Sequence, residues 1–241
     1  MNIKNSSDKI DWNEQSLFTT PLGRTLQQYK MDIVLGKFNK TSEFANYVES
    51  VDNEVYNISR TFWDLDITLK LIKFADPKIK SFKMTKVNRG DYLRYHFENY
   101  FFRLPKLKDQ VLHLLNQIYR MGFSGTFGLE KKVRTHTRVK DNNFSHYLDY
   151  LDYAFEKIKP IRNSIAHRNE LKDSNLALLS LEDLGVLDES QYQMRVQLAI
   201  NNIIPLEKNQ GTLKQTIITL LMMLEDDFNI ELEKLSKNPN I

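Results

Sequence analysis

A run of apolar residues between positions 44 and 72 constrains the fold of this chain more than any other feature of its sequence. The apolar side chains recur at alternating steps of four and three residues: Phe44, Val48, Val51, Val55, Ile58, Phe62, Leu65, Leu69 and Ile72. This spacing predicts one long helix, capped by Thr41 or Ser42 and ended by Asp76 and Pro77. Because a stripe of this length must be covered, we expect it to lie in a helical core or a dimer seam.

Periodic apolar runs elsewhere predict further helices, and no run has the alternation of a strand. We expect these helices over residues 17–38, 91–121 with an interruption at Pro105, 143–168, 191–204 and 212–235. The last should expose an acidic side at Glu225, Asp226 and Asp227. The sequence therefore predicts an all-α fold in which residues 1–241 form a single helical domain and residues 1–16 are flexible.

Composition excludes several classes of site. The chain has no cysteine, which excludes disulfides, thiolate nucleophiles and cysteine-based metal sites and favours a reducing, cytoplasmic location. Residues 1–14 are polar without a continuous apolar segment, so neither a signal peptide nor a membrane span is predicted. His113, His136 and His146 do not pair at metal-ligand spacing, so we predict no metal site and no cofactor.

Residues 159–168, KPIRNSIAHR, concentrate reactive side chains within two helical turns. Arg162 supplies a fixed cation, Asn163 an amide and His167 a titratable imidazole. Asn163 and His167 are four residues apart and share a helix face, whereas Arg162 starts about 140° away from His167. Pro160 should kink or restart the helix, and we expect this bend to aim Arg162. A guanidinium held near an imidazole suits a reaction on a phosphodiester.

The pattern Arg162-Asn163-x-x-x-His167 resembles the R-[polar]-x-x-x-H signature of the HEPN superfamily. Residues 92–119 (YLRYHFENYFFRLPKLKDQVLHLLNQIY) are similar to the helix pair that precedes this motif in stand-alone bacterial members. The resemblance covers residues 92–168 as a HEPN-like core, with residues 17–75 and 190–236 as flanking helices. It implies a helical bundle of the HEPN type with a long N-terminal helix and extra C-terminal helices.

The same resemblance implies a metal-independent endoribonuclease that works as a homodimer, with Arg162, Asn163 and His167 as catalytic residues. Such a protein would be a toxin or a phage-defence or stress effector, with an antitoxin or regulatory partner still to be identified. The chain reads His167-Arg168-Asn169 and so departs from the His-x-Tyr ending of HEPN toxins that pair with nucleotidyltransferase antitoxins. The alternative function is a non-catalytic helical module that binds RNA, a nucleotide or another protein.

Basic residues ahead of the motif provide a candidate RNA-binding track, which we assign to Lys131, Lys132, Arg134, Arg138, Lys140 and Arg168. The competing interpretation is an ordinary solvated face. Glu98 is a possible accessory residue of the cleft, or else part of an intrahelical charge pair with Arg103. Arg89 and His96 also fit a looser motif spacing, but Gly90 follows that arginine where the family has a polar side chain.

Overall fold

The computed structural model describes residues 17–76, 78–79, 87–125, 127–156, 158–168, 171, 173–180 and 187–237. These residues form helices and no strand, which confirms the predicted all-α class. The predicted flexibility of residues 1–16 lies outside the described residues. The elements are η1 (Leu17–Thr19), α1 (Pro21–Val34), α2 (Glu43–Phe74), α3 (Arg89–Arg103), α4 (Lys106–Ile118), α5 (Leu129–Thr135), α6 (Thr137–Asp141), α7 (Ser145–Glu156), α8 (Lys159–Arg168), α9 (Ser174–Leu179), α10 (Glu189–Asn201) and α11 (Ile203–Ser236).

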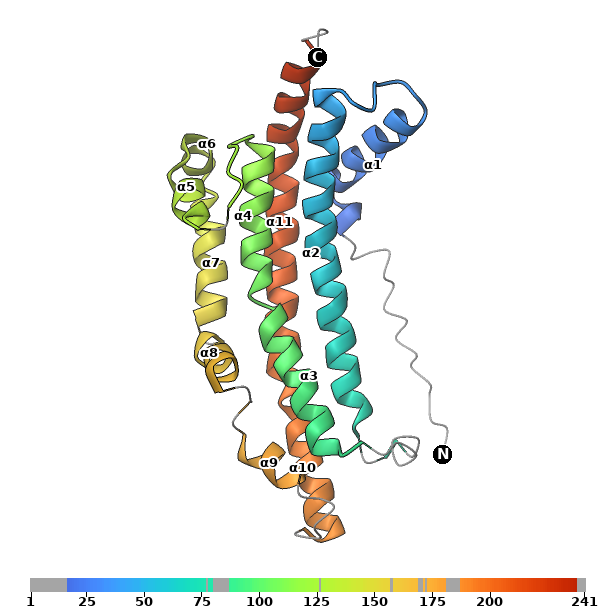
Figure 1. Cartoon of the computed structure of the whole chain (residues 1–241), viewed down its shortest axis with the longest axis vertical. Helices are drawn as coiled ribbons and strands as arrows, with labels where there is room; N and C mark the ends of the chain where they lie inside the picture. Colours follow the sequence, from blue (N-terminus) through green and yellow to red (C-terminus); the bar gives the residue numbers. More distant parts are fainter. Residues whose placement is uncertain are drawn as a thin grey trace.

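Helix α2 is the central element of the bundle. Ser42 caps it, because the serine hydroxyl accepts a hydrogen bond from the backbone N–H of Ala45 at 3.1 Å. Every side chain of the predicted apolar stripe is at most 8% exposed. The stripe is covered by α1, α3, α4 and α11, and Figure 1 shows α2, α4 and α11 side by side along the long axis. The stripe is therefore core within one chain.

Two predicted helices are interrupted near a proline. The predicted 91–121 helix forms as α3 and α4, which meet at Leu104 and Pro105, as expected. The predicted 143–168 helix forms as two helices, α7 and α8, and α8 begins one residue before Pro160, which confirms the restart expected there. Since the first four N–H groups of a helix have no intrahelical partner, Pro160 is tolerated in this first turn and marks the restart.

The C-terminal helices differ from the prediction in two respects. The expected gap between residues 204 and 212 is wrong, because α11 is continuous from Ile203 to Ser236 and the break falls at Asn202. Pro205 lies in the first turn of α11, where its missing N–H removes no helical hydrogen bond. The acidic side is also not fully exposed, since Asp227 is only 7% exposed and pairs with Arg138 of α6.

Helix α8 lies at the edge of the bundle, where it contacts α3 and α7 (Figure 1). The neighbouring α9 packs on α3 and α10. Gly90 permits this packing, because a Cβ atom at that position would come within 2.3 Å of the backbone nitrogen of Ser180. Across the described part of the chain, no helix combines the length and the apolar character that a membrane span requires.

Candidate functional site

The three motif side chains lie on the solvent-facing side of α8. Arg162, Asn163 and His167 are all exposed, whereas Ile165 is 3% exposed and Ile161 packs against the core. Ile161 and Ile165 are four residues apart, so the apolar residues of the motif fix one face of α8 against the bundle. The polar residues are left on the remaining arc of the helix.

The motif side chains make no hydrogen bond or ion pair with the other residues that the structure describes. Asn163 and His167 share a helix face, and Arg162 starts about 140° from His167 around the axis. The side chains of Arg162 and His167 therefore leave the helix in different directions. The long arginine side chain must bend to reach a ligand that His167 contacts. An exposed guanidinium, amide and imidazole with no partner in the described part of the chain are available to an external anion.

Glu98 has a different contact from the one that its position in the sequence suggested. Its carboxylate Oε1 accepts a hydrogen bond from the backbone N–H of Leu171 at 2.6 Å. This bond joins α3 to Leu171, which lies between α8 and α9 in the chain. Sequence reasoning missed this partner because Leu171 lies 73 positions further along the chain and carries no polar side chain.

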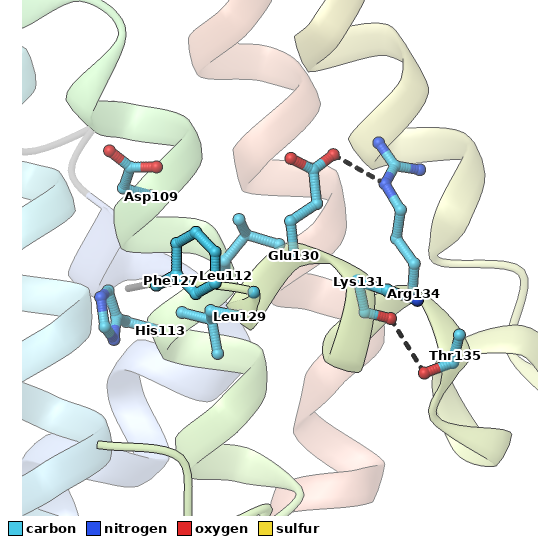
Figure 2. A pocket seen from close by; sticks show the side chains of 10 residues that line it. Asp109, Leu112, His113, Phe127, Leu129, Glu130, Lys131, Arg134 and Thr135 are labelled. Carbon is cyan, nitrogen blue, oxygen red and sulfur yellow. Dashed lines mark hydrogen bonds and ion pairs between the residues drawn. The ribbon is translucent and has the colours of Figure 1, made fainter. Parts of the chain in front are cut away.

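Arg134 of the predicted basic track is bound to carboxylates. It pairs with Glu130 at 2.9 Å, Asp149 at 2.6 Å and Asp152 at 2.5 Å, so it joins α5 to α7. Figure 2 shows the contact between Glu130 and Arg134. Lys108 of α4 also pairs with Glu130 and Asp152. Burial raises the pKa of Glu130, but hydrogen bonds from Lys108 and Arg134 outweigh burial and hold that pKa below its ordinary value.

Arg138 is bound in a second cluster. Its guanidinium pairs with Asp227 at 2.6 Å and Glu231 at 2.5 Å, and it lies 4.7 Å from the ring centre of Tyr119. Asp227 also accepts hydrogen bonds from the Tyr119 hydroxyl at 2.6 Å and the Asn142 amide at 2.7 Å. Burial and the bond to Asp227 raise the pKa of Tyr119 well above its ordinary value, so the phenol stays a donor.

The three lysines of the predicted track face solvent. Lys131, Lys132 and Lys140 are exposed, and the Lys132 ammonium lies 4.0 Å from the ring centre of Phe123. Lys131 and Lys140 have no ion-pair partner among the described residues. The side chain of Arg168 lies outside the described residues. The predicted track thus divides into two arginines that join helices and three lysines that face solvent.

An open groove of about 790 Å³ lies beside Lys131, between α4 and the start of α5 (Figure 2). Leu112 and Leu129 form its apolar part, and Phe127 stands fully exposed at its edge. The groove does not include any residue of α8. Within the residues that the structure describes, no cluster of three or more histidine or carboxylate side chains could hold a metal ion.

The second arginine–histidine pair does not face solvent. Arg89 is 5% exposed and His96 is 9% exposed, and both lie within α3. Burial, with a smaller contribution from the charge of Arg103, lowers the pKa of His96 below its ordinary value. A neutral, buried imidazole is poorly placed for an external substrate, so α8 remains the candidate site.

Comparison with known proteins supports the resemblance that the motif indicated. The model of the family described as Cthe2314-like HEPN matches residues 37–229. This match reaches from the residues before α2 into the last third of α11, well beyond the 92–168 core that the motif suggested. No curated protein and no solved structure gives a match. Because the family match spans most of the chain and includes all of α8, the protein belongs to the Cthe2314-like HEPN family.

Proposed function

We propose that this protein is a metal-independent endoribonuclease that cleaves RNA through attack of the ribose 2′-OH on the adjacent phosphate. The observation that carries the proposal is the exposure of Arg162 and His167 on one short helix, with no side-chain partner among the described residues, in a chain of the HEPN family. The apolar anchoring of α8 through Ile161 and Ile165 supports it further, because a rigid support keeps the reactive side chains in a fixed orientation.

His167 is the general base or the general acid in this mechanism. An imidazole has an ordinary pKa near 6.5, so it can accept the proton of the 2′-OH or donate one to the leaving 5′ oxygen. Arg162 neutralises the charge that grows on the non-bridging phosphate oxygens, for which a planar two-pronged donor is well matched. Asn163 lies one turn before His167 on the same face and orients the imidazole or the phosphate. The product is a 2′,3′-cyclic phosphate.

A homodimer completes the site. One chain supplies a single Arg162 and His167 set, whereas the reaction needs both a general base and a general acid. A two-fold dimer with α8 near its axis brings two sets to one cleft, since an isologous interface repeats every contact. We therefore expect sedimentation-velocity measurements to give twice the chain mass, and a monomer that still cleaves RNA would contradict this part of the proposal.

The exposed lysines extend the RNA-binding surface. Lys131, Lys132 and Lys140 lie on α5 and α6, which Figure 1 places at the opposite end of α7 from α8. Helix α7 is about 18 Å long, so an RNA strand that contacts both ends must cover several nucleotides. These ammonium groups contact the phosphate backbone and contribute affinity without base specificity.

The test is cleavage of single-stranded and structured RNA by the purified protein in EDTA. We expect cleavage with 2′,3′-cyclic phosphate ends, no cleavage of DNA, and at least about a hundredfold loss of rate in Arg162→Ala and His167→Ala. His146→Ala, at an exposed histidine of α7, and Arg60→Ala, at an exposed arginine of α2, are the matched controls and should cleave normally. An inactive wild type, or motif variants that cleave RNA at the wild-type rate, would reject the mechanism.

A cellular assay tests the toxin or defence role. Expression of an active nuclease should arrest growth, and His167→Ala should relieve the arrest at the same protein level. Growth arrest that persists in the His167→Ala variant would separate toxicity from the proposed chemistry and favour a binding function.

A further inference from the structure

A second cavity lies on the buried side of α8. It has a volume of about 360 Å³ and is mainly apolar. The main wall residues are Phe97 and Phe101 of α3, Ile161 of α8, Leu171, Leu176 of α9 and Leu206 of α11. An apolar cavity of about 150 Å³ can hold a benzene molecule, so this cavity has room for a two-ring compound. None of the residues in the candidate nuclease site lines it.

The cavity walls are fixed in place by polar contacts. Glu98 holds the backbone of Leu171 at 2.6 Å. Asp173 caps α9, since its Oδ1 accepts hydrogen bonds from two backbone N–H groups of the first turn at 2.8 and 3.0 Å. Arg195 of α10 donates to the side chain of Asn175 at 2.8 Å and ties α9 to α10. A cavity with supported walls is already formed before a ligand binds, which lowers the cost of binding.

Asp173 determines which kind of ligand the cavity prefers. Its side chain is half-buried and lines the cavity together with the apolar residues. It has no ion-pair partner among the described residues, and no hydrogen bond to Oδ2 is formed within that part of the chain. A carboxylate only accepts hydrogen bonds, so a ligand that complements Asp173 must bring a donor, and a cationic donor is favoured over a neutral one.

We propose that this cavity binds a small molecule that has an apolar body of about two rings and one protonated amino group. The apolar body packs between Phe97, Phe101 and Ile161, and the ammonium group pairs with Asp173 at the edge of the cavity. A ligand in this position touches α8 through Ile161, the residue immediately before Arg162. The site is distinct from the exposed face that carries Arg162 and His167.

The proposal is tested by isothermal titration calorimetry of the full-length protein. Three probe compounds of nearly the same shape are used. The probes are 2-naphthylmethylamine, 2-naphthylmethanol and 2-naphthoate, which differ in charge at one position. We expect the amine to bind about fivefold more tightly than the alcohol, as a partly exposed ion pair allows, and the carboxylate to bind most weakly. No saturable binding of the amine, or equal affinity for all three probes, would overturn the proposal.

Asp173→Asn is the decisive variant, because asparagine caps a helix as well as aspartate does and only the charge is lost. It should remove the preference for the amine over the alcohol. Asp188→Asn is the matched control, because Asp188 caps α10 in the same way but does not line the cavity. It should keep the preference. Retention of the preference in Asp173→Asn would place the amine elsewhere and refute the site.

Ala199→Phe tests the location independently. Ala199 is 2% exposed and lines the cavity, so a phenylalanine there should fill the space and weaken all three probes at least about tenfold. A folded Ala199→Phe variant, verified by circular dichroism, that still binds the amine normally would also refute the site. If that variant does not fold, Asp173→Asn still decides the question. Probe binding is measured without RNA, so this proposal and the nuclease proposal can fail separately.

Discussion

Replacing Arg138 with glutamine separates two roles for this residue, an RNA contact and a link between helices. In the structure Arg138 is the cation between Asp227 and Glu231, whose side chains are only 11% and 9% exposed. Arg138→Gln keeps most of the side-chain length but removes the charge. Both carboxylates then remain buried without their main cationic partner. A buried charge that has lost its partner is strongly destabilising.

The expected loss of stability follows from these contacts. Removal of one partner from a buried ion pair costs about 3–5 kcal/mol. We expect the lower end, about 3 kcal/mol, because the Arg138 side chain is 28% exposed and Lys234 still pairs with Glu231 at 2.7 Å. For a domain of this size that loss lowers the Tm by about 6–12 °C. Differential scanning calorimetry at pH 7 measures it directly.

The pH dependence of this loss of stability provides a second test. Burial raises the pKa of Glu231, but hydrogen bonds from Lys234 and Arg138 outweigh burial, so the folded pKa lies below the ordinary 4.5. The stabilisation is therefore complete above pH 4.5 and is lost as the pH falls through the lowered pKa. The difference in Tm between wild type and Arg138→Gln should therefore be constant above pH 4.5 and should shrink as the pH falls below that value.

Lys140→Gln is the matched control, since it removes an exposed charge two residues away. Its Tm should stay within about 2 °C of wild type. The interpretation of Arg138 as a structural residue would be refuted if Arg138→Gln melted like wild type and instead lost affinity for RNA.

Three further substitutions test the packing around α2, α8 and α9. Leu65→Ala, at a fully buried position of the α2 stripe, should cost about 3 kcal/mol by chemical denaturation, and a loss below about 1 kcal/mol would mean that the stripe is not core. Gly90→Ala would place a Cβ atom 2.3 Å from the backbone nitrogen of Ser180, so α3 and α9 should separate and the Tm should fall by about 4 °C or more. Glu98→Ala removes the acceptor for the Leu171 N–H, and hydrogen exchange at the Leu171 amide should become faster, whereas Glu98→Gln keeps an acceptor and should protect it.

The sequence was sufficient to predict those features that depend on local periodicity. The α2 stripe is visible because its side chains repeat every three or four residues, and the same rule places Ile161 and Ile165 on the buried face of α8. The family motif predicts that the site lies on α8, and this prediction awaits the cleavage assay. Proline positions predicted the interruption at Pro105 and the restart at Pro160, because a missing N–H is tolerated only in the first turn.

The contacts that join distant segments could not be predicted in this way. Arg138 and Glu231 are 93 positions apart, and nothing in the local pattern shows that they meet. The acidic run around Asp227 has the composition of a solvated face, yet Asp227 is buried because α6 packs there and supplies a cation. Local charge patterns indicate how many charges a segment has, but the tertiary packing decides which of them are paired.

The basic segment 131–140 contains cations that pair with carboxylates and lysines that have no ion-pair partner among the described residues. Arg134 pairs with Asp149 of α7 and Arg138 pairs with Asp227 of α11, while Lys131 and Lys140 are exposed. The arginines hold α5 and α6 on the bundle, and this attachment keeps the lysines in fixed positions at the surface. Loss of RNA binding in an Arg134 or Arg138 variant would therefore reflect displacement of the lysines, so the affinity must be measured below the melting temperature of each variant. Only a lysine variant that melts like wild type can identify a direct contact with RNA.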